Sequence, residues 1–308
     1  MTFTSPALAA DSLAGLSVGD AFGDQFFMLA NRDVSRRDGL PAAPWVWSDD
    51  TEMACSVVDV LHRLGRIDQD TLAMAFASRM DMGRRYGAGA LELLELVRDG
   101  ADWRRASAES FGGNGSYGNG AAMRVAPLGA WFRGDLERAA AQAALSAAVT
   151  HAHPEGIAGA IAVAVAASHV AASRAEGVRP DTSEVIDAVL DHLPAGYVRS
   201  GLERARRMPQ ATAAQAAWEL GNGSRITAQD TVPFALWAAT RHLGDYEAAV
   251  RACVVVGGDM DTTAAIAGGV VGAHLGADAI PVAWRAAREP LPTWLTPQAA
   301  SVERPADR

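Results

Sequence analysis

The sequence has little cysteine and no surplus of positive charge. Its two cysteines, Cys55 and Cys253, stand in apolar helical contexts, so they imply no disulfide framework and are expected in the core of a cytoplasmic protein. The formal net charge of −9 excludes a basic surface of the kind that holds a nucleic-acid backbone. Since no signal peptide precedes the first helix and apolar runs are interrupted, we expect a soluble protein with no membrane partner.

Aromatic residues and alternating strand patterns are also scarce. Aromatics make up 6% of the chain against 49% hydrophobic residues, and alanine is abundant throughout, which is typical of closely packed helices. We therefore predict an all-α fold: a single compact, orthogonal multi-helix domain over residues 1–290, followed by a polar C-terminal tail at 291–308. Apolar periodicity and turn signals predict helices at 6–20, 50–64, 69–80, 87–98, 135–149, 154–176, 182–193, 197–206, 211–219, 229–242, 246–256, 262–275 and 278–287, with a short segment opening at Trp103.

Glycines recur at every fourth position of the first predicted helix, at Gly15, Gly19 and Gly23. This spacing favours tight packing of one helix face against another backbone. A phosphate-binding loop is the alternative, but no strand precedes these glycines and no Lys-Ser or Lys-Thr pair follows them.

Two acidic clusters, Ser48-Asp49-Asp50-Thr51 and Asp259-Met260-Asp261-Thr262, stand at the start of apolar helices. Neighbouring carboxylates repel one another and are costly to remove from water, so a bound cation is the simplest way to neutralise their charge. If the two helix starts meet, their Ser, Thr and Asp oxygens form a cage that suits Mg²⁺ or Mn²⁺, while the absence of Cys/His spacing argues against zinc. The alternative is that these residues are helix caps alone, yet each cluster holds more carboxylates than a cap needs.

The segment 111–120 is the most glycine-dense part of the chain. Its backbone N–H groups are predicted to form an anion-binding nest before an Asn-capped helix that starts near Ala121, with Phe111 and Tyr117 available to stack on a base. A plain flexible connector is the alternative. His151 and His153 come just before a predicted helix start at Pro154. Their spacing makes them a poor pair of metal ligands, but one of them is a candidate for contact with the substrate.

A long loop at 31–47 leads into the first acidic cluster and ends in Trp45 and Trp47. A loop of this length that leads into a candidate site more often has a function than serves only as a connection. The two indoles either wall the site or anchor the loop in the core.

In order along the chain, the motifs Gly19-Asp20-Ala21-Phe22-Gly23, Trp47-Ser48-Asp49-Asp50-Thr51, the segment 115–124, Thr150-His151 and the segment 257–262 resemble the ADP-ribosylglycohydrolase superfamily. That group includes the dinitrogenase-reductase-activating glycohydrolase. The resemblance implies an all-α fold with two Mg²⁺ (or Mn²⁺) ions at helix N-termini, in an enzyme that removes mono-ADP-ribose from a modified protein. The net charge already argues against stable binding of nucleic acid, and we expect a monomer.

Carried over by position, the resemblance assigns three groups of residues. The metal ligands are Ser48, Asp49, Asp50, Asp259, Asp261 and Thr262, and the candidate catalytic carboxylates are Asp49 and Asp261. The substrate-binding residues are Phe111, Gly113, Gly115, Ser116, Tyr117, Gly118, Asn119, Met123 and His151, with the aromatics flanking adenine and the loop cradling the diphosphate.

The acceptor expected from the sequence is arginine on a protein, because a guanidine leaves with less acid assistance than an alkoxide. Serine-directed relatives carry a mobile glutamate where this chain has Phe27, and arginine-directed bacterial relatives present an acidic residue near Arg84-Arg85. Serine, nucleobase or small-molecule linkages are therefore alternatives. A non-catalytic ADP-ribose-binding or structural protein is a further alternative, which both intact acidic motifs disfavour.

Overall fold

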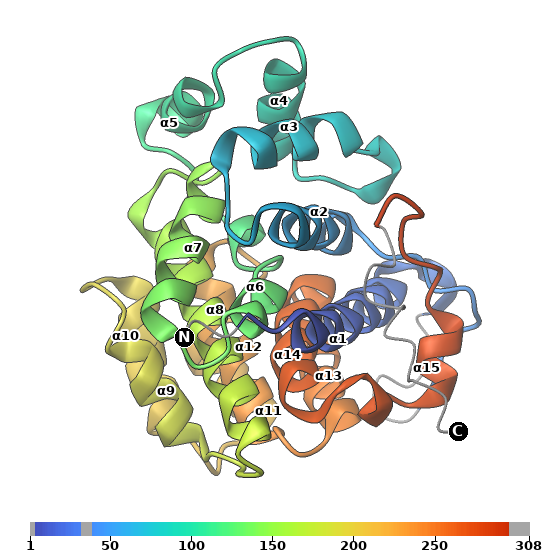
Figure 1. Ribbon diagram of the computed structural model, residues 1–308. Coiled ribbons are helices and arrows are strands. Elements are labelled where there is room, and N and C mark those ends of the chain that lie inside the picture. Colours follow the sequence, from blue (N-terminus) through green and yellow to red (C-terminus); the bar gives the residue numbers. More distant parts are fainter. Residues whose placement is uncertain (1–3, 32–38, 296–308) are drawn as a thin grey trace, which may run out of the picture.

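The computed structural model describes residues 4–31 and 39–295, and over these residues it consists of α-helices and short 3₁₀ turns without a β-strand (Figure 1). The predicted all-α class is confirmed. The α-helices are α1 (Pro6–Asp24), α2 (Asp49–Leu64), α3 (Gln69–Arg79), α4 (Ala88–Arg98), α5 (Trp103–Gly113), α6 (Ala126–Trp131), α7 (Leu136–Ala148), α8 (Pro154–Ala175), α9 (Thr182–Leu190), α10 (Tyr197–Arg206), α11 (Ala213–Leu220), α12 (Ala228–Arg241), α13 (Tyr246–Val255), α14 (Met260–Leu275) and α15 (Val282–Ala287).

Most predicted helices lie within a few residues of the observed ones, and the differences have local causes. Helix α6 was not predicted, because six apolar residues are too few to show a helical period. The expected Asn-capped α-helix near Ala121 is wrong: only a 3₁₀ turn, Asn119–Ala121, forms there, and the Asn119 side chain bonds elsewhere. The last predicted helix is divided into a 3₁₀ turn (Ala277–Ala279) and α15, with Pro281 between them.

Helices α1 and α14 lie side by side at the centre of the molecule, the first in dark blue and the second in red-orange (Figure 1). A Cβ atom at Gly15 would lie 2.2 Å from the carbonyl oxygen of Gly268, and one at Gly19 would lie 2.2 Å from that of Ala264. At the end of α1, a Cβ on Gly23 would lie 2.3 Å from the carbonyl oxygen of Met260. The predicted close packing is confirmed, and it holds the end of α1 against the start of α14.

Helix α8 is long and apolar enough to cross a membrane by length and composition, contrary to the expectation that no segment would be. The residues of its most apolar 18-residue window are 78% buried inside the molecule, where α8 packs against α6, α7 and α14. A central helix of a folded core passes the same test of length and hydropathy.

The two tryptophans before the first acidic cluster belong to the core, not to the site. Trp45 is buried with its ring 5.2 Å from Phe22 and 5.8 Å from Trp284, and Trp47 is buried beneath the guanidinium of Arg84. Residues 32–38 of the loop that precedes them lie outside the described residues.

The first residues assigned to the C-terminal tail pack on the domain. Leu291, Trp294 and Leu295 contact an apolar cluster formed by α1, α2 and α14, and the ring of Trp294 lies under the guanidinium of Arg79. The rest of the predicted tail, residues 296–308, lies outside the described residues.

Candidate functional site

The two acidic clusters, far apart in sequence, meet where α2 and α14 begin. The Oγ1 atom of Thr262 lies 3.5 Å from Oδ1 of Asp50. The close packing of α1 on α14 brings the two helix starts together, because Asp20 of α1 also binds Ser48, the N-cap residue of α2. The convergence predicted from the sequence is therefore present in the structure.

Asp20, on the last turns of α1, holds the start of α2 in place. Its carboxylate accepts hydrogen bonds from the backbone N–H and the hydroxyl of Ser48, at 3.0 and 2.8 Å, and from the N–H and hydroxyl of Thr51. Burial raises the pKa of Asp20 to about 6, while these hydrogen bonds act in the opposite direction. Sequence analysis assigned Asp20 no role of its own, since a single Asp within an apolar helix carries no local signal of its partners.

A cavity of about 420 Å³ opens over this junction. It is lined by the start of α2, residues 85–90 before and within α4, the loop 110–120, the turn at 150–151, the turn at 225–227 and the start of α14. Six widely separated parts of the chain thus build one cleft, with carboxylates at one end and the glycine-rich loop at the other. These are named here the acidic end and the glycine end.

The acidic end collects four carboxylates with little to neutralise them. Burial first, and the neighbouring carboxylates second, raise the pKa values of Asp49, Asp50 and Asp261 well above that of a free Asp. The pKa of Asp259 is also raised by burial, although hydrogen bonds from its neighbours lower it in part. Such a group of carboxylates is unfavourable unless protons or cations compensate it.

The donor set fits a hard divalent cation. All candidate ligand atoms are oxygens, and Oδ2 of Asp50 is buried without a hydrogen-bond partner. Over the described ranges, no three His, Cys, Asp or Glu side chains already stand at the mutual spacing of a metal site, so binding requires the carboxylates to turn toward one another. Residues Asp49, Asp50, Asp259 and Asp261 are those placed to do so.

Asp259 is held from the glycine end of the cleft. The Nδ2 atom of Asn119 donates to Oδ2 of Asp259 at 2.6 Å and to the hydroxyl of Thr231 at 3.0 Å. The backbone N–H of Asp259 donates to the carbonyl oxygen of Asn222 at 3.0 Å. Asn119, predicted to contact substrate, therefore also connects the glycine-rich loop to a carboxylate of the acidic end.

The loop at the glycine end uses left-handed backbone and presents its aromatics to solvent. Phe111 has φ +53°, and Gly112, Gly113 and Gly115 also have positive φ. The side chains of Phe111 and Tyr117 are 61% and 42% exposed. Because both rings line the cleft without burying themselves, their apolar faces are free to stack on a planar ligand.

His151 lies beneath this loop and is hydrogen-bonded to the hydroxyl of Thr150. The buried Arg124 donates to the hydroxyl oxygen of Thr150 at 3.0 Å, so the proton of that hydroxyl is free for Nδ1 of His151, 2.7 Å away. We infer that Nε2 carries the imidazole proton; a Cβ at Gly118 would lie 3.2 Å from that nitrogen. Burial and the charge of Arg124 lower the pKa of His151 to about 3, which keeps the ring neutral.

The cleft gathers most, but not all, of the predicted site residues. It is lined by Asp49, Asp50, Phe111, Ser116, Tyr117, Gly118, Asn119, Met123, His151, Asp259, Asp261 and Thr262. Ser48 lies behind this lining, with its hydroxyl bonded to Asp20 and to the N–H of Asp50. Gly113 and Gly115 also lie outside the lining, and Gly115 packs against the backbone at 152–153. Lining the cleft is a position and not a role, so the roles assigned to all of these residues stay predictions.

Several residues that line the cleft were not among the predicted site residues, and two of them, Arg85 and Ile226, are of interest for their contacts. Arg85 lines the cavity and pairs with Asp24, a fully buried carboxylate at the end of α1. Ile226 lines the opposite side, and its carbonyl oxygen accepts from the N–H of Asn119. Both have left-handed backbone, which a sequence does not reveal for residues other than glycine.

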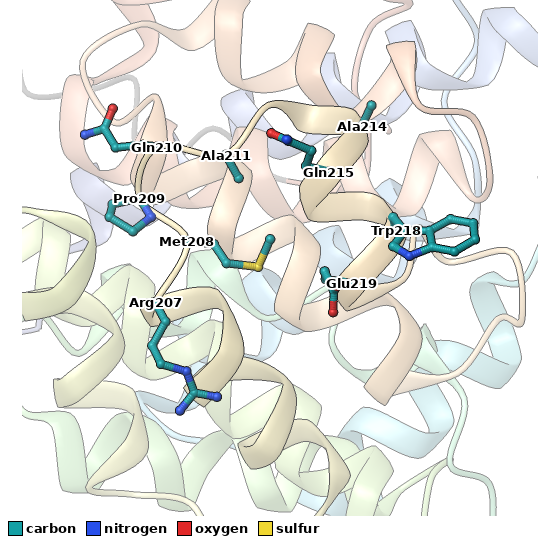
Figure 2. A pocket seen from close by; sticks show the side chains of 9 residues that line it. All are labelled: Arg207, Met208, Pro209, Gln210, Ala211, Ala214, Gln215, Trp218 and Glu219. Atoms are coloured by element: carbon teal, nitrogen blue, oxygen red, sulfur yellow. The ribbon is translucent and has the colours of Figure 1, made fainter.

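A second hollow lies away from the carboxylates, between the turn at 207–211 and α11. Figure 2 shows the indole of Trp218 projecting outward at its rim, where the side chain is 87% exposed. Arg207 and Glu219 are the charged residues among those that line it. This hollow has no carboxylate cluster, so the acidic cleft is the better candidate site.

Comparisons with known proteins agree with this geometry. A sequence model of the ADP-ribosylglycohydrolase family matches residues 6–307. The chain is 29% identical to "ADP-ribosylhydrolase ARH3" of Danio rerio, over 90% of this chain and 85% of that protein, and 30% identical to the protein of the same name from Homo sapiens, over 89% and 86%. A solved chain titled "ADP-ribosylglycohydrolase-related protein complex" shares the fold, with a TM-score of 0.65 at 24% identity and coverage of 92% and 93%.

Proposed function

The chain belongs to the ADP-ribosylglycohydrolase family and is a glycosidase-type hydrolase, and from this we propose that its cleft removes a single ADP-ribose from an acceptor with the help of divalent cations. The observation that carries the proposal is the shape of one cavity. It has clustered carboxylates at one end and, at the other, a glycine-rich loop with two exposed aromatic rings.

We assign the glycine end to the adenosine diphosphate part of the substrate. The faces of Phe111 and Tyr117 suit the adenine ring, and the backbone of the 116–120 turn suits the diphosphate. The Nε2–H of His151, fixed by Thr150, is a donor aimed at the same part of the cleft. This arrangement leaves the ribose that bears the acceptor at the acidic end.

At the acidic end the chain's own residues position carboxylates around the anomeric carbon. Asp20 fixes the start of α2, and Asn119 fixes Asp259, so the helix starts that carry the carboxylates are in place before the substrate binds, and only side chains have to turn. Asp49 and Asp261 are half-buried and face the cavity, and either can take the proton of the attacking water as general base.

Asp49, Asp50, Asp259 and Asp261 would hold two Mg²⁺ or Mn²⁺ ions, with Thr262 contributing a hydroxyl. When bound, such cations supply Lewis-acid activation of water and hold the ribose hydroxyls. Their charge would also offset the mutual repulsion that raises the pKa values of these carboxylates. The metal, its identity and the number of ions are parts of the proposal.

The acceptor is the finer part of the proposal. The sequence favours arginine, but the guanidinium of Arg85 lines the cleft near the carboxylates, where it repels a second guanidinium. We therefore propose an acceptor joined through oxygen, with serine as the test case, in place of arginine.

The test is a panel of substrates measured with one preparation. Peptides carrying ADP-ribose on serine and on arginine are incubated with Mg²⁺, with Mn²⁺ and with a chelator, and released ADP-ribose is quantified. We expect serine-linked turnover that requires a divalent cation. Metal at a hundred times its Kd should also raise the free energy of unfolding by about 2.7 kcal/mol, which thermal melting detects.

Two outcomes would contradict the proposal. Turnover and melting temperature that are indifferent to metal and chelator would remove the metal from it. ADP-ribose binding without hydrolysis of any linkage would leave a binding protein in place of an enzyme acting on these substrates.

A further inference from the structure

Arg85 and Asp24 form a charged pair that the proposed reaction does not use. Asp24 ends α1, is fully buried and does not line the cleft, whereas Arg85 does line it and has a side chain that is 45% exposed. The pair thus has an inner, shielded carboxylate and an outer guanidinium. A molecule entering the cleft meets the cation and not the anion.

The pair lies at the acidic end. Asp24 directly follows Gly23, whose missing Cβ would be 2.8 Å from the Cα of Asp261. Arg85 precedes Tyr86, whose hydroxyl donates at 2.7 Å to Glu52 in the first turn of α2. Both partners are therefore tied to the elements that carry the carboxylates, on the side where the acceptor must leave.

The backbone at Arg85 is held in an unfavourable conformation. Its φ of +64° is left-handed, and the described ranges contain only two other such non-glycine residues, Phe111 and Ile226. All three line this cleft. Left-handed backbone is unfavourable at a residue with a Cβ, so its restriction to the cleft within the described ranges indicates that these side chains serve the ligand.

We propose that Arg85, anchored by Asp24, selects the acceptor by its charge. This inference rests on the proposed function and names its substrate class: ADP-ribose attached through oxygen next to negatively charged groups. One nitrogen of Arg85 is engaged by Asp24, which leaves the other donors of the planar guanidinium for an anionic group beside the scissile bond. Once divalent cations offset the carboxylates of the acidic end, a cationic acceptor meets the like charge of Arg85 and is disfavoured.

The experiment compares the same serine–ADP-ribose bond in an acidic and in a basic peptide. Two peptides of equal length each carry one ADP-ribosylated serine, flanked by glutamates in one and by lysines in the other. With the full-length protein in saturating Mg²⁺, we expect kcat/KM to be about tenfold higher for the acidic peptide, the size of a partly screened charge contact. The double variant Asp24→Asn/Arg85→Gly should reduce this ratio to about one.

The double variant is designed to fold. Glycine accepts the left-handed backbone at position 85, and asparagine leaves no buried charge at position 24. Arg85→Gly alone strands the buried carboxylate, so its melting temperature should fall and should recover in the double variant. Arg66→Gln is the control, because Arg66 is an exposed arginine that pairs with Asp68 and does not line the cleft, and its ratio should stay that of the unaltered protein.

The outcomes separate the two proposals. Hydrolysis of both peptides at equal rates, or a tenfold ratio that survives in the double variant, overturns the role of Arg85 and leaves the proposed function standing. Absence of hydrolysis with serine-linked and arginine-linked substrates overturns the proposed function and the acceptor selection with it.

Discussion

At the acidic end of the cleft the side chains are buried and belong to helix starts, whereas at the glycine end the two aromatic rings are exposed and belong to a loop. Asp50 is 2% exposed and Phe111 is 61% exposed, although both line the same cavity. The first end is positioned by packed backbones, since α1 and α14 touch through glycines. The second is positioned by left-handed residues in the last turn of α5 and directly after it, at 111–115.

Because of this difference, residues at the acidic end should affect the stability of the fold, whereas residues at the glycine end should affect mainly ligand binding. At the acidic end, folding without a cation gathers carboxylates that repel one another, so side chains needed for the reaction oppose folding. At the glycine end, the exposed rings bury little against the protein and contribute little to folding. Substitutions at the two ends should therefore differ in their effects on stability as well as on activity.

The largest expected effect is at the acidic end, with Asp261→Asn. The variant keeps the shape of the side chain but removes a charge, so turnover should fall by at least about a hundredfold. In a chelator the same variant should melt at an equal or higher temperature than the unaltered protein, because one of the crowded carboxylates is gone. Steady-state assays and thermal melting measure the two effects on one preparation.

Asp278→Asn is the control for Asp261→Asn. Asp278 is fully exposed and pairs with Arg285 far from the cleft, so its loss should change neither turnover nor melting. Full activity of Asp261→Asn would refute the assignment of the acidic end.

The second effect concerns pH and distinguishes a buried neutral group from the carboxylates. His151 has a pKa of about 3 in the folded protein against 6.5 for a free histidine. Below pH 6.5 the unfolded chain binds a proton at this position and the folded protein does not, so stability falls as pH falls. Between pH 7 and pH 5 this loss is about 2 kcal/mol.

Urea unfolding of the unaltered protein and of His151→Gln at pH 7, 6 and 5 tests this. Burial also lowers the pKa values of His62, His169, His242 and His274, so both proteins should lose stability toward pH 5. The variant should lose about 2 kcal/mol less. Equal losses in the two proteins would mean that His151 is protonated in the folded state.

Sequence reasoning recovered the acidic end better than the rest of the cleft, for physical reasons. Clustered carboxylates before an apolar helix are visible locally, because their repulsion has to be offset wherever the helix lies. Asp20 and Asp24 stand singly in α1, and their partners Ser48 and Arg85 are known only from the three-dimensional structure, in which α1 packs against α2. No pattern in the sequence predicts the contacts of Asp20 with Ser48 or of Asp24 with Arg85.

At the fold level, long amphipathic or alanine-rich segments were predictable, and short ones were not. Helix α6 and the 3₁₀ turn at Asn119–Ala121 depend on tertiary contacts: Asn119 bonds to Asp259 and Thr231 in place of capping a helix. From the sequence, Trp45 and Trp47 could either line the site or anchor the loop in the core. Only the packing of Phe22 and Trp284 around Trp45 assigns that ring to the core.

The smallest expected effect, at the glycine end, completes the contrast. Tyr117 is 42% exposed, and the ring contact found for it is an edge-on one with His153 at 5.3 Å. Tyr117→Ala should weaken ADP-ribose binding about tenfold, since stacking of one base contributes about 1–3 kcal/mol, while the free energy of unfolding changes by less than about 1 kcal/mol. Tyr117→Phe keeps the ring and should keep the affinity. Trp218→Ala removes a more exposed aromatic outside the cleft (Figure 2) and should change neither quantity. Calorimetric titration with ADP-ribose measures all three variants; unchanged affinity in Tyr117→Ala would mean that the adenine does not stack on this ring.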